Sequence, residues 1–320
     1  MNIAIIDMGT NTFNLLIARI TGDGGFNILL KEKAGVKLGK GGINQKIITR
    51  EAFQRGIDAL DKHLKTIQKY NVGHIFTTAT SGVRSTENGK EFVETVEKKF
   101  KLTVQIISGD KEAELIYHGV KQAVEFNEQN VLILDIGGGS NEFIIANHSG
   151  IAWKRSFDLG IARLLDRFNP SDPITPSEIN AVEDYIEQNI TPLAEAVEKY
   201  RPEILIGCSG TFDSFRDMII AKKNSFPGEI KKQISYPINP DDYHSLHREL
   251  IRSTLAERLK MEGLEIVRVE MIVLASIFVN FILRKFKLKT IIQSSYAIKE
   301  GLLIDILNRN RKAYGKDSGH

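Results

Sequence analysis

The chain has 320 residues, enough for about two domains with substantial hydrophobic cores. Its composition, 42% hydrophobic and 26% charged, is that of an ordinary globular protein, and a net charge of only +3 argues against a nucleic-acid partner. The single cysteine, Cys208, excludes an intramolecular disulfide framework and a cysteine-rich metal site. Because no secretory signal or membrane-spanning segment is recognisable, we expect a cytoplasmic protein with no membrane partner.

The first part of the chain predicts hairpin strands followed by alternating helices and strands. Two or three strands are expected within residues 1–30, with a turn at Gly22, Gly24 and Gly25. Apolar residues at helical spacing then predict an amphipathic helix over 49–70. The elements expected next are a strand at 75–79, a helix at 90–100, a strand at 102–107 and a helix at about 111–125.

The second part repeats this plan. The expected elements are strands at 131–157, helices at 176–200, a strand at 204–206, helices at 241–260 and 265–286, a strand at 290–292 and a last helix from about 298. The apolar window 271–283 is too short to span a bilayer and predicts a buried helix. The order of elements indicates an α/β fold with helices on both faces of its sheets. The helix and loop at about 120–130, which are polar over 125–130, indicate the boundary between two domains that pack closely around a cleft.

One stretch, 131–145, stands out because it is duplicated. An apolar strand ends at Asp135, turns through three glycines and Ser140, and re-enters an apolar strand. The same plan occurs at residues 5–18, where an apolar strand ends at Asp7. At a constant spacing, Ile5, Asp7, Gly9, Ile17, Ala18 and Gly22 recur as Ile133, Asp135, Gly137, Ile145, Ala146 and Gly150. Two such turns of backbone N–H groups predict two concave anion seats, most naturally for phosphate.

The residues around Asp135 suit a charged ligand. A carboxylate at the end of an apolar strand is costly unless it binds a cation or accepts hydrogen bonds. The glycines 137–139 allow the backbone to approach an anion, and Ser140 adds a hydroxyl donor. Glu142 lies two residues further along a strand and shares a face with Ser140. A tight hairpin with an Asx-type turn is the structural alternative.

Three acids lie in the first turn of the helix expected after 106–109. Asp110, Glu112 and Glu114 are all favoured there by the helix dipole, which is a sufficient reason for their presence. Each of them is also a candidate for a chemical role. Their spacing does not choose among them.

Further candidates for phosphate binding follow two other strands. Arg84 in the segment 80–84 is a candidate bidentate phosphate ligand, or simply a surface arginine. The segment 207–211 opens a helix and offers N–H groups and hydroxyls, or is an ordinary strand–helix turn. Among the histidines, only His244 and His247 have a spacing of interest, and we expect that pair to lie solvated on a polar helix face rather than to bind metal.

Together these motifs resemble the exopolyphosphatase / guanosine pentaphosphate phosphohydrolase (Ppx/GppA) family, of the sugar kinase–Hsp70–actin superfamily. Residues 6–12 look like the opening phosphate loop of that family, and 79–84 with Asn88 like its second segment. Residues 107–113 are similar to its Ser-Gly-x-Glu-Glu-Ala segment, whose second Glu is the catalytic acid of the family. Residues 135–142 match its most specific motif. The resemblance is completed by the segments 160–164, 209–211, 268–270 and 294–301.

The resemblance implies a duplicated actin-like (ribonuclease H-like) fold around a central cleft. It places the first domain at 1–124, completed by the C-terminal helix at about 297–320, and the second at 125–296. It implies a Mg²⁺-dependent homodimer that releases terminal phosphate from polyphosphate or pppGpp. Glu112 would then be the general base. The implied metal ligands are Asp135, Glu142 and Asp7, and the implied phosphate-binding residues are Gly9, Thr10, Asn11, Arg84, Gly137, Gly138, Gly139, Ser140, Asn141, Ser209, Gly210 and Thr211.

The sequence also departs from the family pattern. Lys111 stands in place of the usual first Glu, Asn14 of Arg or His, Asn141 of Thr, Cys208 of Thr or Ser, and Lys299 of Arg. The chain resembles the short form of the family, which lacks a further C-terminal helical domain and so predicts weaker processive action on long polyphosphate. Three alternatives remain: a non-catalytic (p)ppGpp or polyphosphate sensor, a nucleotide-dependent kinase of the same superfamily, and an actin-like filament protein.

Overall fold

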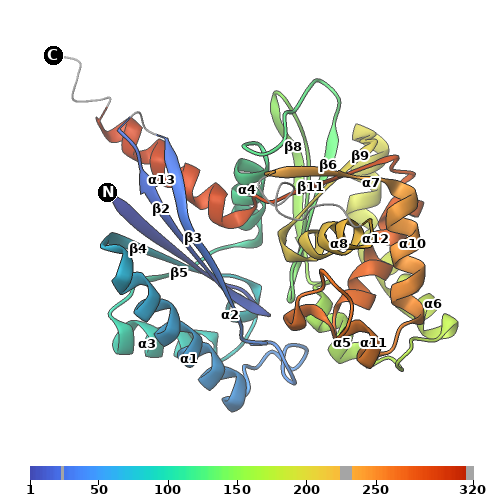
Figure 1. Cartoon of the computed structure of the whole chain (residues 1–320), viewed down its shortest axis with the longest axis horizontal. Helices are drawn as coiled ribbons and strands as arrows, with labels where there is room; N and C mark the ends of the chain where they lie inside the picture. The colour runs from blue at the N-terminus through green and yellow to red at the C-terminus, as the bar shows by residue number, and fades with distance from the viewer. Residues whose placement is uncertain (23–24, 224–232, 315–320) are drawn as a thin grey trace. The chain divides into compact units, whose positions relative to one another are not determined.

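The structure, a computed structural model, describes residues 1–22, 25–223 and 233–314, so Gly24 of the predicted first turn lies outside the described residues. The chain divides into two compact units (Figure 1). Unit 1 consists of Met1–Gly119 together with the chain from Ile298 onward, and unit 2 is Val120–Ala297. The boundaries expected from the sequence, 124/125 and 296/297, lie close to these positions.

Unit 1 is built on a five-stranded sheet. Its strands are β1 (Asn2–Met8), β2 (Thr12–Ile20), β3 (Phe26–Gly35), β4 (Val72–Ala79) and β5 (Val104–Ile106), in the order β3-β2-β1-β4-β5. The first three strands form an antiparallel meander, whereas β4 runs parallel to β1 and β5 parallel to β4. Alternate β1 residues such as Ile6 and Met8 enter a core with Phe13 and Phe92. Asp7, between Ile6 and Met8 in the strand, therefore lies on the opposite face of the sheet.

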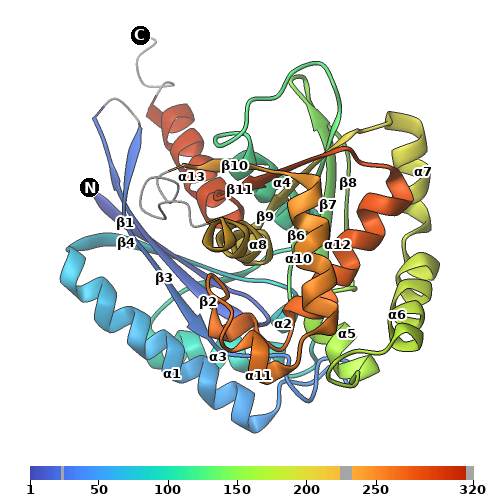
Figure 2. The same cartoon turned by 45° about the vertical axis from the view of Figure 1, so that its right-hand side comes forward.

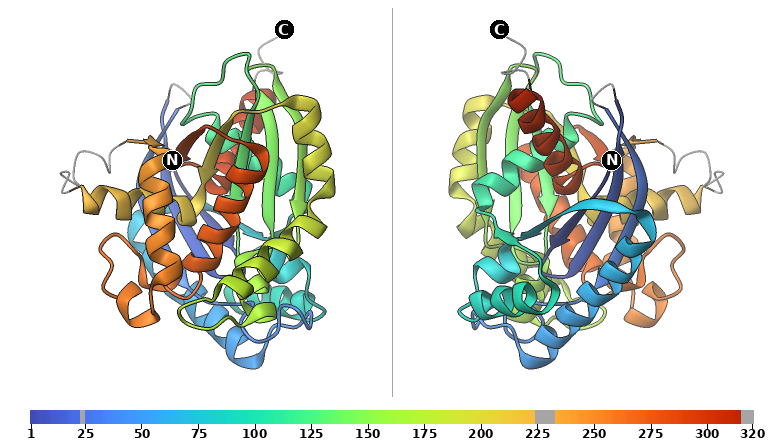
Figure 3. Two further views of the ribbon diagram at one scale, coloured as in Figure 1. Left: turned by 90° about the vertical axis from the view of Figure 1, so that its right-hand side faces the viewer. Right: turned by 90° about the vertical axis from the view of Figure 1, so that its left-hand side faces the viewer.

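Helices lie on both faces of this sheet. They are α1 (Arg50–Ile67), the 3₁₀ turn η1 (Gln68–Tyr70), α2 (Ser81–Arg84), α3 (Gly89–Phe100), α4 (Gly109–Val120) and α13 (Ile298–Tyr314). α1 begins at Thr49, whose hydroxyl accepts a hydrogen bond from the Ala52 N–H and caps the helix. The sheet runs between α1 on one side and α13 on the other (Figures 1 and 3).

Unit 2 contains a six-stranded sheet with the same beginning. Its strands are β6 (Val131–Ile136), β7 (Asn141–Asn147), β8 (Gly150–Phe157), β9 (Ile204–Cys208), β10 (Ser235–Ile238) and β11 (Thr290–Ser294), in the order β10-β11-β9-β6-β7-β8. An antiparallel meander, β6-β7-β8, is followed by β9 parallel to β6 and β11 parallel to β9. This order repeats that of β1-β2-β3, β4 and β5. The predicted duplicated, actin-like α/β fold is therefore confirmed.

The helices of unit 2 cover the face of the sheet that carries Leu134 and Ile136. They are α5 (Ile161–Phe168), α6 (Pro176–Asn189), α7 (Thr191–Tyr200), α8 (Ser209–Lys222), α10 (Pro240–Arg252), α11 (Leu255–Arg258), the 3₁₀ turn η2 (Ile266–Arg268) and α12 (Ile272–Phe286). Figure 2 shows α8, α10 and α12 in front of the strands. As predicted, the apolar window 271–283 falls in a largely buried helix, α12. In the described part of the chain, no helix is both long and apolar enough to cross a membrane.

The expected helices of unit 2 are shorter than their apolar patterns suggest. The region 241–260 is interrupted after Arg252, because Thr254 starts α11 with a capping box to Glu257. The expected helix at 265–286 opens with the 3₁₀ turn η2 and becomes α-helical only at Ile272.

The expectation for His247 is wrong. Its Nδ1 lies 2.6 Å from the Ser276 hydroxyl on α12, so the ring is half-buried between two helices rather than solvated. Burial lowers the pKa of His247 to about 4, and nearby His244, Arg248 and Arg284 add to this.

Candidate active site

Each sheet carries a row of polar residues on the face away from its helix-packed core. The strand registers place them side by side. In unit 1 the row is Asn14, Asp7, Thr78 and Gln105, and in unit 2 it is Ser156, Glu142, Asp135, Cys208 and Ser294. Because Asp7 and Asp135 occupy equivalent strands, the duplication seen in the sequence extends across both sheets.

The glycine turn after β6 is shaped to receive an anion. Its carbonyl oxygens are bonded elsewhere: that of Gly137 to the Ile161 N–H (3.0 Å), that of Gly138 to the Ala162 N–H (2.8 Å) and that of Gly139 to the Arg163 Nε (2.7 Å). Within the described residues, the N–H groups of Gly138, Gly139 and Ser140 have no acceptor. A run of unused N–H groups is a typical anion-binding nest.

The turn after β1 has the same construction. The Thr10 carbonyl accepts from the Gly39 N–H (3.2 Å), and the Asn11 carbonyl accepts from two further N–H groups. The N–H groups of Thr10 and Asn11 have no acceptor among the described residues. The buried Asn11 Oδ1 and Ser81 Oγ also have no hydrogen-bond partner there. Since buried polar atoms are rarely left unpaired, these atoms point to an interaction with a ligand.

Asp135 and Glu142 form a buried pair of acids beneath the turn of unit 2. They are direct neighbours in the antiparallel register of β6 and β7, and they are 6% and 1% exposed. Asp135 Oδ2 accepts from the Ser209 hydroxyl (2.7 Å), and Glu142 Oε1 accepts from Ser140 (2.6 Å) and Ser156 (2.7 Å). Two buried carboxylates side by side repel each other, so this arrangement favours a bound cation.

This donor set fits Mg²⁺, which binds oxygen ligands and commonly uses one or two carboxylates together with substrate phosphates and water. Within the described residues no group of three or more histidine, cysteine or acidic side chains is arranged to hold a metal ion, so the candidate site depends on the two carboxylates alone. Cys208 lies beside Asp135 in the strand register, and burial together with the Asp135 carboxylate raises the pKa of its thiol well above the ordinary value.

Asp7 has different neighbours. Burial raises its pKa, while Lys299 and a 3.1 Å hydrogen bond from Asn14 Nδ2 act in the opposite direction. The register partner of Asp7 is thus an amide, where Asp135 has a second acid. Its predicted role as a metal ligand stays a prediction, and its surroundings support that role less well than those of Asp135.

Glu112 and Arg84 are brought together in unit 1. Glu112 is buried in the first turn of α4, and its Oε2 lies 3.1 Å from Arg84 Nη1. The same nitrogen donates to the Ile107 carbonyl (2.8 Å), which fixes the guanidinium. Asp110 is exposed and Glu114 pairs with Lys111 (3.6 Å), so the geometry separates the three acids that spacing leaves equivalent.

The segment 209–211 forms the N-terminal turn of α8. Ser209 has a φ of +63°, an uncommon value for a residue other than glycine, and its hydroxyl is directed to Asp135. Gly210 leaves room for the guanidinium of Arg268: a Cβ atom at this position would lie 1.4 Å from Arg268 Nη2. Arg268 is 14% exposed and completes this corner of unit 2. The sequence singled out its segment only through the family resemblance, because nothing in the local pattern links it to Gly210.

Two other predicted positions have structural contacts. Asn141 is fully buried and donates from Nδ2 to the Leu159 carbonyl (2.9 Å), which secures the end of the glycine turn. Arg163, in the segment 160–164 of the family resemblance, donates from Nε to the Gly139 carbonyl (2.7 Å) and pairs with Asp158 (3.5 Å). Both hold the turn in shape, and direct phosphate binding by Asn141 remains a prediction.

The chain is similar to known proteins over nearly its whole length. A model of the Ppx/GppA phosphatase family matches residues 16–310. A crystal structure of an exopolyphosphatase from Cytophaga hutchinsonii ATCC 33406 is 40% identical, with a TM-score of 0.93, and the match covers 96% of this chain and 98% of that one. An Aquifex aeolicus member of the Ppx/GppA family, 23% identical with a TM-score of 0.76 over 97% of this chain and 98% of that one, has the same fold.

A relative from Fusobacterium nucleatum subsp. nucleatum, a bifunctional 3-dehydroquinate synthase/phosphatase, is 35% identical over 219 residues. The match covers 65% of this chain and only 32% of that protein, so this chain aligns with about a third of its relative.

Proposed function

The chain belongs to the Ppx/GppA phosphatase family, and on that premise we propose that it is a Mg²⁺-dependent phosphoanhydride hydrolase that releases terminal phosphate from polyphosphate, pppGpp or both. The observation that carries the proposal is the turn of unused N–H groups at 138–140 beside the buried Asp135–Glu142 pair. One part suits an anion and the other a cation, which is the combination that a metal-bound phosphate requires.

In the proposed reaction each residue has a separate role. Glu112 accepts a proton from the attacking water, as a general base does within hydrogen-bond reach. Arg84 holds the Glu112 carboxylate through Nη1 and leaves further N–H donors for a phosphoryl oxygen. The turn at 9–11 in unit 1, and the turn at 137–140 with the segment 209–211 in unit 2, each offer N–H groups that position a phosphate. In phosphoryl transfer such positioning and charge stabilisation supply most of the acceleration.

Asp135 and Glu142 would hold Mg²⁺ directly or through water. When bound, the ion neutralises charge on the phosphates and polarises the bond that breaks. The hydroxyls of Ser140, Ser156 and Ser209 already orient the two carboxylates, so the protein supplies a preformed pair of oxygen ligands.

A non-catalytic polyphosphate or (p)ppGpp sensor is the second candidate function. The observation in its favour is that Arg84 Nη1 is bonded to both Glu112 and the Ile107 carbonyl. If Arg84 stayed bonded to the Glu112 carboxylate when the ligand is bound, Glu112 would not activate water. The protein would then bind a phosphate chain without hydrolysing it. Calorimetric binding of pppGpp or tripolyphosphate with no phosphate release over hours would support the sensor.

The proposal is tested by phosphate release from tripolyphosphate, long polyphosphate, pppGpp and ATP, each with and without Mg²⁺. Glu112→Gln keeps the side-chain shape and removes the base, so we expect turnover to fall by about 10³-fold with tripolyphosphate binding retained. Glu114→Gln, two residues along the same helix, is the matched control and should keep nearly full activity. Equal turnover in the wild type and Glu112→Gln would reject Glu112 as the base. Release from none of the substrates would reject the hydrolase.

A further inference from the structure

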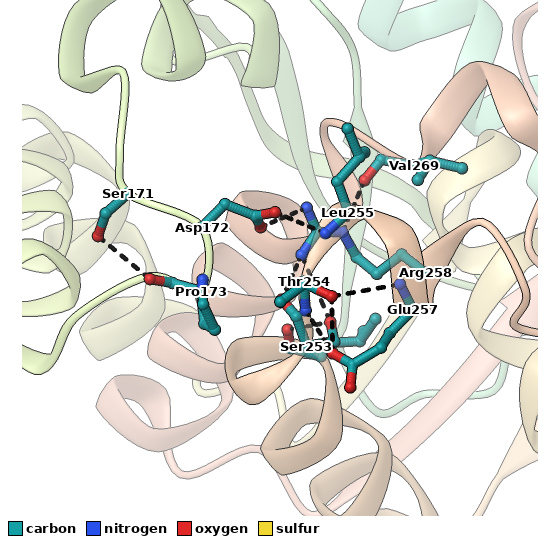
Figure 4. Close-up of polar contacts among 10 residues, drawn as sticks. Ser171, Asp172, Pro173, Ser253, Thr254, Leu255, Glu257, Arg258 and Val269 are labelled. Carbon is teal, nitrogen blue, oxygen red and sulfur yellow. Dashed lines mark hydrogen bonds and ion pairs between the residues drawn. The ribbon is translucent and has the colours of Figure 1, made fainter.

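Arg258 is a buried arginine that the proposed reaction does not use. It ends the short helix α11, and its residue is 5% exposed. Its guanidinium makes bonds in three directions: Nη2 donates to Asp172 Oδ1 (2.8 Å), Nε to the Val269 carbonyl (3.0 Å) and Nη1 to the Ser253 carbonyl (2.6 Å). Figure 4 shows these contacts converging on the one side chain.

Asp172 anchors the arginine from a different part of unit 2. It lies in the loop between α5 and α6, and its Oδ2 accepts the Leu255 N–H (2.5 Å) at the start of α11. The arginine and the acid thus join the α5–α6 loop, the end of α10 and the segment before α12 (Figure 4). Arg258 is buried but the Asp172 side chain is exposed, so this ion pair adds little stability by itself. A role in fixing geometry accounts better for its presence.

The geometry that it fixes is that of Arg268. Val269, whose carbonyl Arg258 holds, is 2% exposed and follows Arg268 directly in the chain. Arg268 lies against Gly210 in the first turn of α8, next to Ser209 and its bond to Asp135. Its Nε also lies 3.1 Å from Glu265 Oε2, so the guanidinium is held from its own side as well.

A second close approach shows that this segment lies along α8. Gly263 has a φ of +85°, and a Cβ atom there would lie 2.5 Å from the Asp217 backbone. The segment 259–271 therefore contacts α8 at Gly210 and, about two turns further along, at Asp217. Arg258 fixes both ends of this segment: it precedes the segment in the chain, and its Nε holds Val269 near the other end.

We propose that Arg258, anchored by Asp172, is a positioning residue that holds Arg268 over the N-terminal turn of α8, where the Arg268 guanidinium binds a phosphoryl group of the substrate. This inference rests on the proposed function for the identity of the substrate. Arg258 itself does not reach the substrate. It acts through the Val269 backbone, which sets the direction of the neighbouring side chain.

The test is a double-mutant cycle with two readouts. Arg258→Met keeps the length and loses every hydrogen bond, and Arg268→Ala removes the guanidinium. We measure kcat and KM for Mg²⁺-dependent phosphate release from tripolyphosphate, and the Kd of inorganic pyrophosphate with Mg²⁺ by calorimetry. Each single variant should weaken binding by about tenfold or more, as expected for a lost charged hydrogen bond, with kcat changed far less. In the Arg268→Ala background, Arg258→Met should have almost no further effect on KM or Kd.

Thr254→Ala is the control for a merely structural role. It removes the capping hydroxyl of α11 and leaves the Arg258–Val269 bond intact, so its KM should equal that of the wild type even if its melting temperature falls. If Arg258→Met does not fold, Asp172→Asn removes the anchoring charge and serves in its place. Equal effects of the Arg258 variant in both Arg268 backgrounds would overturn the proposal, as would an unchanged Kd in Arg268→Ala.

The binding readout separates this proposal from the hydrolase proposal. A wild type that binds pyrophosphate but releases phosphate from none of the tested substrates would refute hydrolysis, and the same cycle on Kd would then confirm or refute the positioning of Arg268 by Arg258. If the wild type hydrolyses tripolyphosphate and Arg258→Met has unchanged Kd and KM, only the proposed positioning of Arg268 by Arg258 is refuted.

Discussion

The first hairpins of the two units share a backbone plan and differ in charge. In β1–β2, Asp7 faces Asn14, and Lys299 is the main charge acting against its raised pKa. In β6–β7, Asp135 faces Glu142, and three serine hydroxyls surround the pair. Both turns present unused N–H groups, so phosphate binding belongs to the shared plan. The second acid belongs to unit 2 alone, and it points to a specialised cation site there.

We expect the largest effect from neutralising an acid of unit 2. Glu142→Gln keeps the hydrogen-bonding shape and removes one metal-binding charge, so Mg²⁺-dependent turnover should fall by about 10²–10³-fold. The concentration of Mg²⁺ needed for half-maximal activity should rise with it. Activity titrated with Mg²⁺ measures both effects. Full activity at the wild-type Mg²⁺ concentration would mean that the cation binds elsewhere.

The packing behind the turn of unit 2 gives the next largest effect. A Cβ atom on Gly160 would lie 2.3 Å from the Gly138 carbonyl oxygen, and the backbone would have to shift. Gly160→Ala should therefore lower the free energy of unfolding by about 2–3 kcal/mol, as overpacking against backbone does. Gly22→Ala in unit 1 is the control, since a Cβ atom there meets nothing within 4 Å. Urea denaturation of both variants decides the matter, and equal stabilities would contradict the close packing of Gly160 against Gly138.

Giving unit 1 the charge pattern of unit 2 is a sharper test of the difference. Asn14→Asp places a second carboxylate beside Asp7, which should cost about 1–3 kcal/mol of unfolding free energy at neutral pH. We expect added Mg²⁺ not to restore this stability, because Lys299 already acts on Asp7. Thermal melts with and without Mg²⁺ measure it. A specific rescue by Mg²⁺ would show that both units can hold a cation.

The smallest expected effect concerns a histidine of unit 2. The pKa of His247 in the folded protein, about 4, lies below the value of about 6.5 for an unfolded chain. The unfolded chain therefore takes up the proton first, and stability is lost as the pH falls from 6.5 to 4. After allowance for partial exposure, this loss is about 1–2 kcal/mol. His247→Gln should flatten the fall of unfolding free energy between pH 7 and 4. An unchanged slope would assign the acid sensitivity to other groups.

Much of the fold could be predicted because its signals are local. The apolar runs ending at Asp7 and Asp135 predict buried strands, and the amphipathic spacing of 49–70 predicts α1 almost to its ends. β10 was not predicted, since Pro237 removes a backbone donor and makes the segment a weak strand pattern. Proline is tolerated there because β10 is an edge strand. The sequence also could not show that the strand order of the two sheets is the same.

The sequence motifs of the candidate site could be predicted, but the contacts between its residues could not. The Asp-x-Gly turns are visible in the sequence, but the pairing of Asp135 with Glu142 comes from strand register. The contact of Arg84 with Glu112 joins residues 28 positions apart, and it distinguishes Glu112 from Asp110 and Glu114. The position of Arg268 and its support by Arg258 depend on how three loops of unit 2 pack together. No periodicity or spacing in the sequence encodes such packing.

The central claim, that water attacks a terminal phosphoryl group with Glu112 as the base, is tested most directly by isotope labelling. Tripolyphosphate is incubated with the protein and Mg²⁺ in ¹⁸O-labelled water, and the released phosphate is analysed by mass spectrometry. We predict one ¹⁸O atom in each phosphate released by the wild type and almost no release by Glu112→Gln. Release without the label, or labelled release that is undiminished in Glu112→Gln, would contradict the account.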